Sequence, residues 1–150
     1  MESFPTSSPL SAPEIVHRLN SIPRTIYENK NVRFVYLGGS AAKGTLGWWS
    51  DIDVFLSVEG IRNKSVKDKL ETWLSLNFIM AEITKLDKID INFIEDLPLH
   101  IQLDILRTGI IVYDNGSGQR QAFLEGLLNR VYDHNLWYRK LIEESTLSWS

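Results

Sequence analysis

The chain has 150 residues, 43% of them hydrophobic, and its 16 Lys and Arg against 19 Asp and Glu give a formal net charge of −3. This acidic balance argues against general nucleic-acid binding, which needs a basic face, and the absence of cysteine excludes disulfides and thiolate metal sites. No apolar run could span a bilayer and no signal-peptide pattern opens the chain, so we expect a cytoplasmic protein without membrane contact.

The first residues predict a tail followed by one domain. Residues 1–12 are rich in Ser and Pro, which is typical of a flexible segment, and the expected domain covers 13–150. Ser11, placed just before Pro13, predicts the start of a short helix. Pro23 interrupts that helix, so a second short helical piece is expected around Tyr27.

Hydrophobic periodicity predicts the remaining elements. In the long helix expected near 64–86, the apolar residues that recur at helical spacing are Val66, Leu70, Trp73, Leu74, Phe78 and Ile83. The order of strands and helices predicts the α/β (α+β) class, with a small mixed sheet and helices packed on it. Strands are expected over 32–39, 51–58, 88–94 and 110–114, and further helices near 96–107 and 119–144.

An acidic pair interrupts the apolar pattern of the second strand. Residues two apart in a strand point to the same face, so Asp51 and Asp53 should share one face, roughly 6.6 Å apart along the backbone. Ionised side by side, the two carboxylates would repel each other and raise each other's pKa. Mg²⁺ ions would relieve that repulsion, and two ions about 3.5–4 Å apart could be bridged by such a pair.

Two further features would complete a nucleotide site. The small-residue turn at Gly39 and Ser40 follows a strand, where glycine lets a phosphate approach the backbone, and Lys43 could add positive charge. Asp90 lies in the strand expected over 88–94 and could supply a third carboxylate, although the nearby Asp87 competes for this role. Taken singly, each motif is also compatible with an ordinary solvated strand or turn.

Together these residues resemble a known family. Gly39-Ser40, ten intervening residues and then Asp51-Ile52-Asp53 match the signature of the nucleotidyltransferases related to DNA polymerase β. Asp90 fits the third carboxylate of that family. Within it, the chain is similar to the minimal nucleotidyltransferases (MNT), the antitoxins of HEPN–MNT toxin–antitoxin pairs, and the resemblance covers most of the chain after residue 12.

The resemblance implies a polymerase β palm-like fold and an activity. It implies transfer of AMP from ATP, with two Mg²⁺ ions, to a tyrosine hydroxyl of a HEPN ribonuclease toxin, which would neutralise that toxin. It assigns Gly39 and Ser40 to the triphosphate and the three aspartates to catalysis and the metals. Two alternatives stay open, namely an antitoxin that acts by contact alone and a small-molecule nucleotidyltransferase of the antibiotic-modifying type.

Two tryptophans stand in the segment between the turn and the acidic strand. Trp48 and Trp49 occupy positions where relatives usually carry polar residues, Pro or Asp. Adjacent aromatic residues are typical anchors of interfaces, so they could contact a partner or a nucleotide base. They could equally pack into the local core, because large apolar side chains favour burial.

Overall fold

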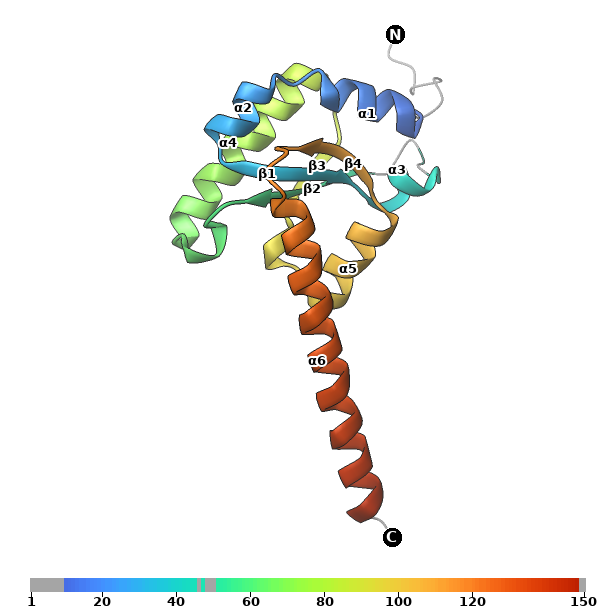
Figure 1. Ribbon diagram of the computed structural model, residues 1–150. Helices are drawn as coiled ribbons and strands as arrows, with labels where there is room; N and C mark the ends of the chain where they lie inside the picture. Colours follow the sequence, from blue (N-terminus) through green and yellow to red (C-terminus); the bar gives the residue numbers. More distant parts are fainter. Residues whose placement is uncertain (1–9, 46, 48–50, 149–150) are drawn as a thin grey trace.

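A mixed four-stranded sheet in the order β3-β2-β1-β4 forms the centre of the molecule (Figure 1). The computed structural model describes residues 10–45, 47 and 51–148, with side chains as far as residue 144. The sheet consists of β1 (Val32–Leu37), β2 (Ile52–Val58), β3 (Ile89–Phe93) and β4 (Ile110–Asp114). β1 pairs antiparallel with both β2 and β4, whereas β2 and β3 run parallel.

Helices cover both faces of this sheet, as the predicted α/β class requires. A short α3 (Gly39–Lys43) follows β1, and two 3₁₀ turns, η1 (Ile61–Asn63) and η2 (Ile94–Asp96), follow β2 and β3. One face packs against α1 (Ala12–Asn20), α2 (Arg24–Asn29) and α4 (Val66–Thr84), and the other against α5 (Leu99–Thr108) and the start of α6 (Gln119–Ser148). The predicted fold class is therefore confirmed.

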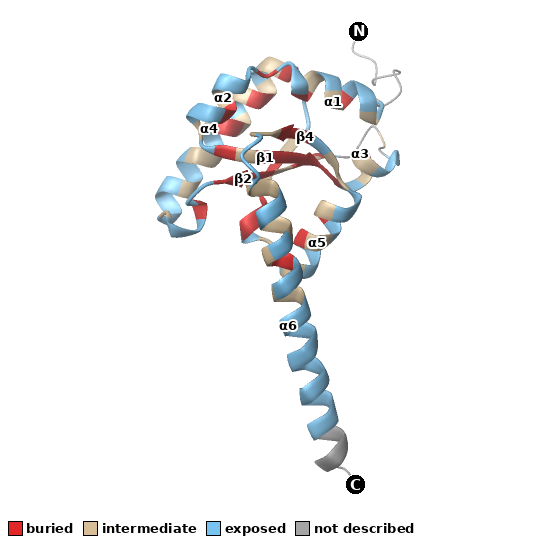
Figure 2. Ribbon diagram, viewed as in Figure 1, coloured by how far each residue is buried: buried red, intermediate tan, exposed pale blue. Residues whose placement is uncertain are grey.

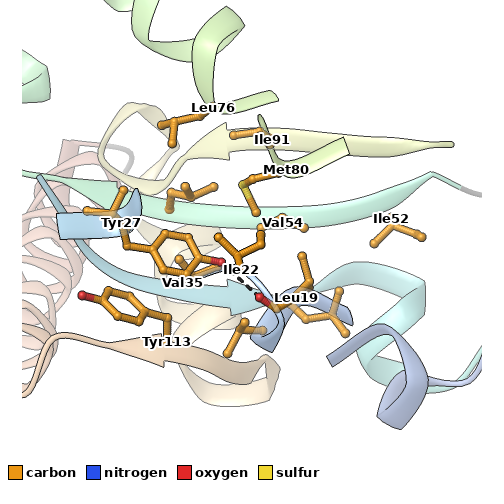
Figure 3. Close-up of a cluster of buried hydrophobic side chains, with 14 of the residues drawn as sticks. Leu19, Ile22, Tyr27, Val35, Ile52, Val54, Leu76, Met80, Ile91 and Tyr113 are labelled. Carbon is orange, nitrogen blue, oxygen red and sulfur yellow. Dashed lines mark hydrogen bonds between the residues drawn. The ribbon is translucent and has the colours of Figure 1, made fainter. Parts of the chain in front are cut away.

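Strand alternation explains the two cores. Ile52, Val54 and Leu56 of β2 are buried among the side chains of α1, α2 and α4, in the larger core shown in Figure 3. The intervening Phe55 contributes to a smaller core on the opposite face, beneath α5 and α6. Asp53 and Ser57 also lie at the alternate positions of this strand, so β2 presents a mixed polar and apolar face towards α5 and α6.

Helix starts agree well with the sequence. The Ser11 hydroxyl accepts a hydrogen bond from the backbone N–H of Glu14 at 3.3 Å, which caps α1 as predicted. The final helix is longer than expected, because it continues to Ser148. None of the described helices is long and apolar enough to cross a membrane.

Only part of the apolar pattern that predicted α4 lies on its buried face, where Trp73 and Ile83 pack against the larger core. Val66, Leu70, Leu74 and Phe78 are all exposed, the first by 85% and the last by 69%. The helix instead buries the stripe that contains Leu76, Met80 and Thr84 against the sheet. Because apolar residues occur on two sides of α4, periodicity located the helix without identifying the side that packs.

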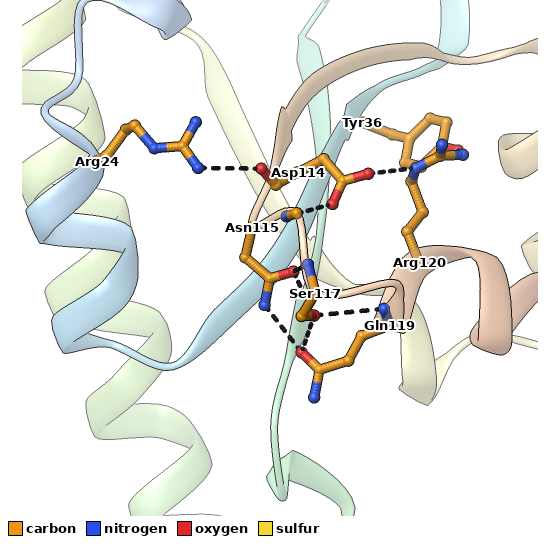
Figure 4. A network of polar contacts seen from close by, with 8 residues as sticks. Arg24, Tyr36, Asp114, Asn115, Ser117, Gln119 and Arg120 are labelled. Carbon is orange, nitrogen blue, oxygen red and sulfur yellow. Dashed lines mark hydrogen bonds and ion pairs between the residues drawn. The ribbon is translucent and has the colours of Figure 1, made fainter.

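A polar network fixes the direction in which α6 leaves the sheet (Figure 4). Arg120 Nε pairs with Asp114 Oδ2 at 2.8 Å, and Arg120 Nη1 donates to the hydroxyl of Tyr36 at 3.3 Å. Arg24 donates to the backbone carbonyl of Asp114 from the opposite side. These contacts join α2, β1, β4 and the first turn of α6.

Candidate active site

The glycine turn after β1 lies directly beside β2. The backbone N–H of Gly38 donates to the carbonyl of Asp53 at 3.0 Å, which continues the antiparallel pairing beyond the end of β1. Gly39, the first residue of α3, has φ of +60°, a conformation that side chains with a Cβ rarely adopt. The local fold therefore requires glycine at position 39 for its backbone alone.

A second constraint on Gly39 comes from the carboxylate of Asp53. A Cβ atom built on Gly39 would lie 2.5 Å from Asp53 Oδ2, well inside van der Waals contact. A Cβ on Gly38 would similarly lie 2.5 Å from the ring of Phe55. Both glycines thus let the turn approach the side chains on the α5 side of β2, and at Gly39 the group approached is an acid.

Asp53 also has a carboxylate as its neighbour on the next strand. The parallel pairing of β2 and β3 places Asp53 directly opposite Asp90, and both side chains are half-buried. Asp51 lies exposed one residue before β2 begins. Burial raises the pKa of Asp53, and the negative charges of Asp90 and then Asp51 raise it further.

The structure separates the two acids that competed for the third position. Asp90 lies inside β3 and faces Asp53, whereas Asp87 lies in the exposed turn before that strand. The described residues contain no preformed group of three or more His, Cys, Asp or Glu side chains able to hold a metal ion. The donor set still fits a hard divalent cation, because such ions prefer carboxylate oxygens and the strand pairing places Asp53 opposite Asp90.

The structure gives no direct contact between the other predicted site residues and the group formed by Gly39, Asp53 and Asp90. Ser40 is half-buried in α3, where its carbonyl accepts a hydrogen bond from the N–H of Thr45 at 2.9 Å. Lys43 is exposed in the last turn of the same helix. Trp48 and Trp49 lie outside the residues that the structure describes.

The sequence did not predict the contact between Phe55 and the glycine turn. The ring of Phe55 lies against Gly38 and supports the turn, although Phe55 belongs to no recognised motif. Its signal was the strand alternation itself, because Phe55 follows Asp53 by two positions and therefore shares its face.

The sequence matches one family model, described as polymerase beta, nucleotidyltransferase, over residues 20–117. This segment includes the glycine turn and all three aspartates. Comparison with curated proteins finds no significant match.

Several solved structures share the fold. A chain from the crystal structure of a toxin–antitoxin with AMP-PNP has a TM-score of 0.56 and 18% identity, covering 92% of this chain and 99% of that chain. A chain from tri-AMPylated Shewanella oneidensis HEPN toxin in complex with MNT antitoxin has a TM-score of 0.56 and 14% identity, covering 89% and 98%. A chain from the toxin–antitoxin MntA-HepT has a TM-score of 0.54 and 15% identity, covering 87% and 97%.

Proposed function

The chain belongs to the polymerase beta nucleotidyltransferase family, and on that premise we propose that it is an antitoxin that transfers AMP from ATP to a tyrosine hydroxyl of a cognate HEPN toxin. Two kinds of observation support the proposal. The family supplies the reaction class, and similar folds occur in structures of a HEPN toxin with an MNT antitoxin and of a toxin–antitoxin with AMP-PNP. Modification of the tyrosine would neutralise the toxin.

The observation that carries the proposal is the meeting of Gly39, Asp53 and Asp90. A turn that excludes any side chain lies against one carboxylate, and that carboxylate faces another across two parallel strands. Such an arrangement is costly without a ligand, because burial and the charge of Asp90 raise the free energy of the charged form of Asp53. A triphosphate accompanied by divalent cations would bring the missing positive charge to this place.

In the proposed reaction the tyrosine oxygen attacks the α-phosphorus of ATP. A bond forms between these two atoms, the bond from the α-phosphorus to the bridging oxygen of the β-phosphate breaks, and pyrophosphate leaves. Asp90 accepts the tyrosine proton, or directs it to solvent. Gly39 and Ser40 hold the triphosphate so that attacking and leaving oxygens are in line.

Asp51, Asp53 and Asp90 are the residues that would hold two Mg²⁺ ions. When bound, such ions neutralise charge on the phosphates and lower the pKa of an attacking hydroxyl. Lys43 would add positive charge near the phosphates from the end of α3. The exposed position of Lys43 makes this a weaker contribution than that of the aspartates.

Intact-mass spectrometry of the cognate HEPN protein after incubation with ATP and Mg²⁺ tests the proposal. With the wild-type chain we expect the HEPN protein to gain the mass of one or more AMP units. With Asp53→Asn or Asp90→Asn we expect it to gain no mass. The melting temperature of Asp53→Asn should not fall, because the substitution removes a repelling charge.

Asp87→Asn is the matched control, since Asp87 is a nearby exposed acid outside the pair. Normal modification by Asp53→Asn would overturn the catalytic assignment. Loss of modification in Asp87→Asn with activity retained in Asp90→Asn would exchange the roles of these two acids. A chain that silences the toxin without any added mass would act by contact alone.

We also propose that Trp48 and Trp49 contact the acceptor. Both stand in the sequence between the phosphate turn and Asp51, and an acceptor tyrosine must reach the α-phosphate there. Replacing both by Ala should weaken modification of the acceptor far more than ATP binding, since aromatic anchors often contribute about 2 kcal/mol or more each. A fall in melting temperature and in both activities together would instead indicate packing in the core.

A further inference from the structure

The last helix extends far beyond the domain on which it begins. Figure 1 shows α6 leaving the sheet and continuing away from the other elements, and its 30 residues span roughly 45 Å. Every residue from 132 to 144 is exposed, as Figure 2 shows, and we call this range the projecting half of α6. A helix in water draws most of its stability from packing of its apolar residues, so a helix exposed on every side is marginally stable by itself.

The exposed apolar side chains of α6 lie on two opposite sides of the helix. Leu128, Tyr132 and Leu136 recur every fourth residue on the first side, and Trp137 and Leu141 do so on the second side. At roughly 100° per residue, the centres of the two sides are about 160° apart. All five side chains are between 44% and 69% exposed. The helix therefore offers apolar surface in two directions.

The first side carries a hollow of the kind that receives a side chain from another helix. Tyr132, Asn135, Leu136 and Arg139 surround a space of about 140 Å³. Their spacing of three, four and seven residues is that of the four side chains around one hole in knobs-into-holes packing. This hollow fits a side chain from a helix that lies along α6.

One neighbouring helix cannot cover both sides of α6, because two packed helices contact each other along one side only. A second copy of this chain would bring a single projecting helix and would leave the other side in water. A helix that is apolar on more than one side is typical of a position enclosed by several elements. The pattern thus favours insertion between helices of a different protein.

The proposed active site lies on the face of the sheet from which α6 projects. Asp53 and Phe55 are two residues apart in β2 and therefore share a face. Phe55 packs in the smaller core together with Phe123 from the first turns of α6. A protein that brings a side chain to Asp53 therefore approaches on the side of the sheet where α6 extends (Figure 1).

We propose that the projecting half of α6 is a docking arm that inserts between helices of the acceptor toxin. This inference rests on the proposed function, which supplies the acceptor. Docking along α6 holds the toxin on the face that carries Asp53, and this raises the effective concentration of its tyrosine at the site. The arm itself takes no part in the chemistry.

Isothermal titration calorimetry of the full chain with the cognate HEPN protein, without ATP, tests docking separately from the reaction. Leu136→Glu changes the first side of α6, and Trp137→Glu changes the second. Each should weaken binding by roughly tenfold or more, because each places a charge in an apolar contact. Leu74→Glu is the matched control, since Leu74 is 52% exposed on α4, which packs on the opposite face of the sheet.

AMP transfer to the same protein gives a second readout. Both α6 variants should raise the acceptor concentration needed for half-maximal transfer by the same factor as the dissociation constant. The maximal rate and the affinity for ATP should stay at the wild-type values, which distinguishes docking from damage to the active site. The melting temperatures of all three variants should also be unchanged, because the replaced side chains are exposed.

Several outcomes would overturn the docking arm. Wild-type binding by either α6 variant, an equal loss in Leu74→Glu, or a wild-type chain that does not bind the HEPN protein would each do so. AMP transfer that does not depend on α6 would overturn the arm and leave the proposed function intact. Binding that depends on α6 without any transfer would support the arm and overturn the proposed function. Self-association that both α6 variants abolish, without binding of the HEPN protein, would assign the arm to a second copy.

Discussion

At the scale of single residues, Gly39 connects the fold to the proposed chemistry. Its backbone needs a positive φ, and its missing side chain leaves room for the carboxylate of Asp53. The motif alone would suggest that Gly39→Val weakens nucleotide binding without lowering the stability of the domain. We expect a loss of stability as well, because a β-branched residue is strongly disfavoured at φ of +60°. Ala is the informative substitution because it adds only the Cβ.

Gly39→Ala should lose the transfer activity, because its Cβ must displace Asp53 Oδ2 from 2.5 Å. Its stability cost should be about 1–2 kcal/mol, the cost of placing a Cβ in the left-handed region. Gly60→Ala is the control, with φ of +75° and no atom within 4 Å of the added Cβ. Thermal denaturation should show similar losses in both variants, and AMP transfer measured at low temperature should fail only in Gly39→Ala. Equal activity in the two would show that the close approach to Asp53 has no catalytic role.

At the scale of elements, the junction between β4 and α6 depends on an ionised Asp114. Hydrogen bonds from Arg120 and then from the N–H of Gly116 hold the pKa of Asp114 below its usual value. A lowered pKa in the folded state means that Asp114 stabilises the fold above its unfolded pKa. This contribution is lost as the pH falls through the lowered value.

Asp114→Asn should therefore lower the stability at neutral pH by roughly 0.5–1 kcal/mol, the range of a partly exposed ion pair. The difference from wild type should disappear in strong acid, where Asp114 of the wild type is also protonated. Urea denaturation at a series of pH values measures this difference. Asp104→Asn, at an exposed position of α5, should show no such dependence. A constant difference across all pH values would contradict the ionic explanation.

The sequence predicted elements better than it predicted their faces. Strand alternation correctly separated Ile52 and Val54 from Asp53, because a strand has only two faces and one of them was apolar. In α4 apolar residues occur on more than one side of the helix, so the sequence does not show which side packs. Phe78 is exposed, for example, while Met80 is buried. The pairing of Asp53 with Asp90 depends on the register of two strands separated by a whole helix, which local pattern does not encode.

At the scale of the whole molecule, the domain and the projecting half of α6 are energetically separate. Leu127 is fully buried, whereas residues 132–144 are all exposed. Leu127→Ala should cost about 2–5 kcal/mol, the usual loss for a buried leucine. Truncation after Val131 should leave the melting temperature of the dilute protein close to that of the full chain. A large loss on truncation would show that the projecting half supports the domain.

The most direct test of the central claim follows the label from ATP to the cognate HEPN protein. With the label on the α-phosphate, the wild-type chain should transfer it to a tyrosine of the acceptor, and Asp53→Asn should transfer none. With the label on the γ-phosphate, the acceptor should stay unlabelled and the label should leave in pyrophosphate, because the bond broken lies between the α- and β-phosphates. Labelling of the acceptor from the γ-phosphate, or no labelling from either position, would contradict nucleotidyl transfer.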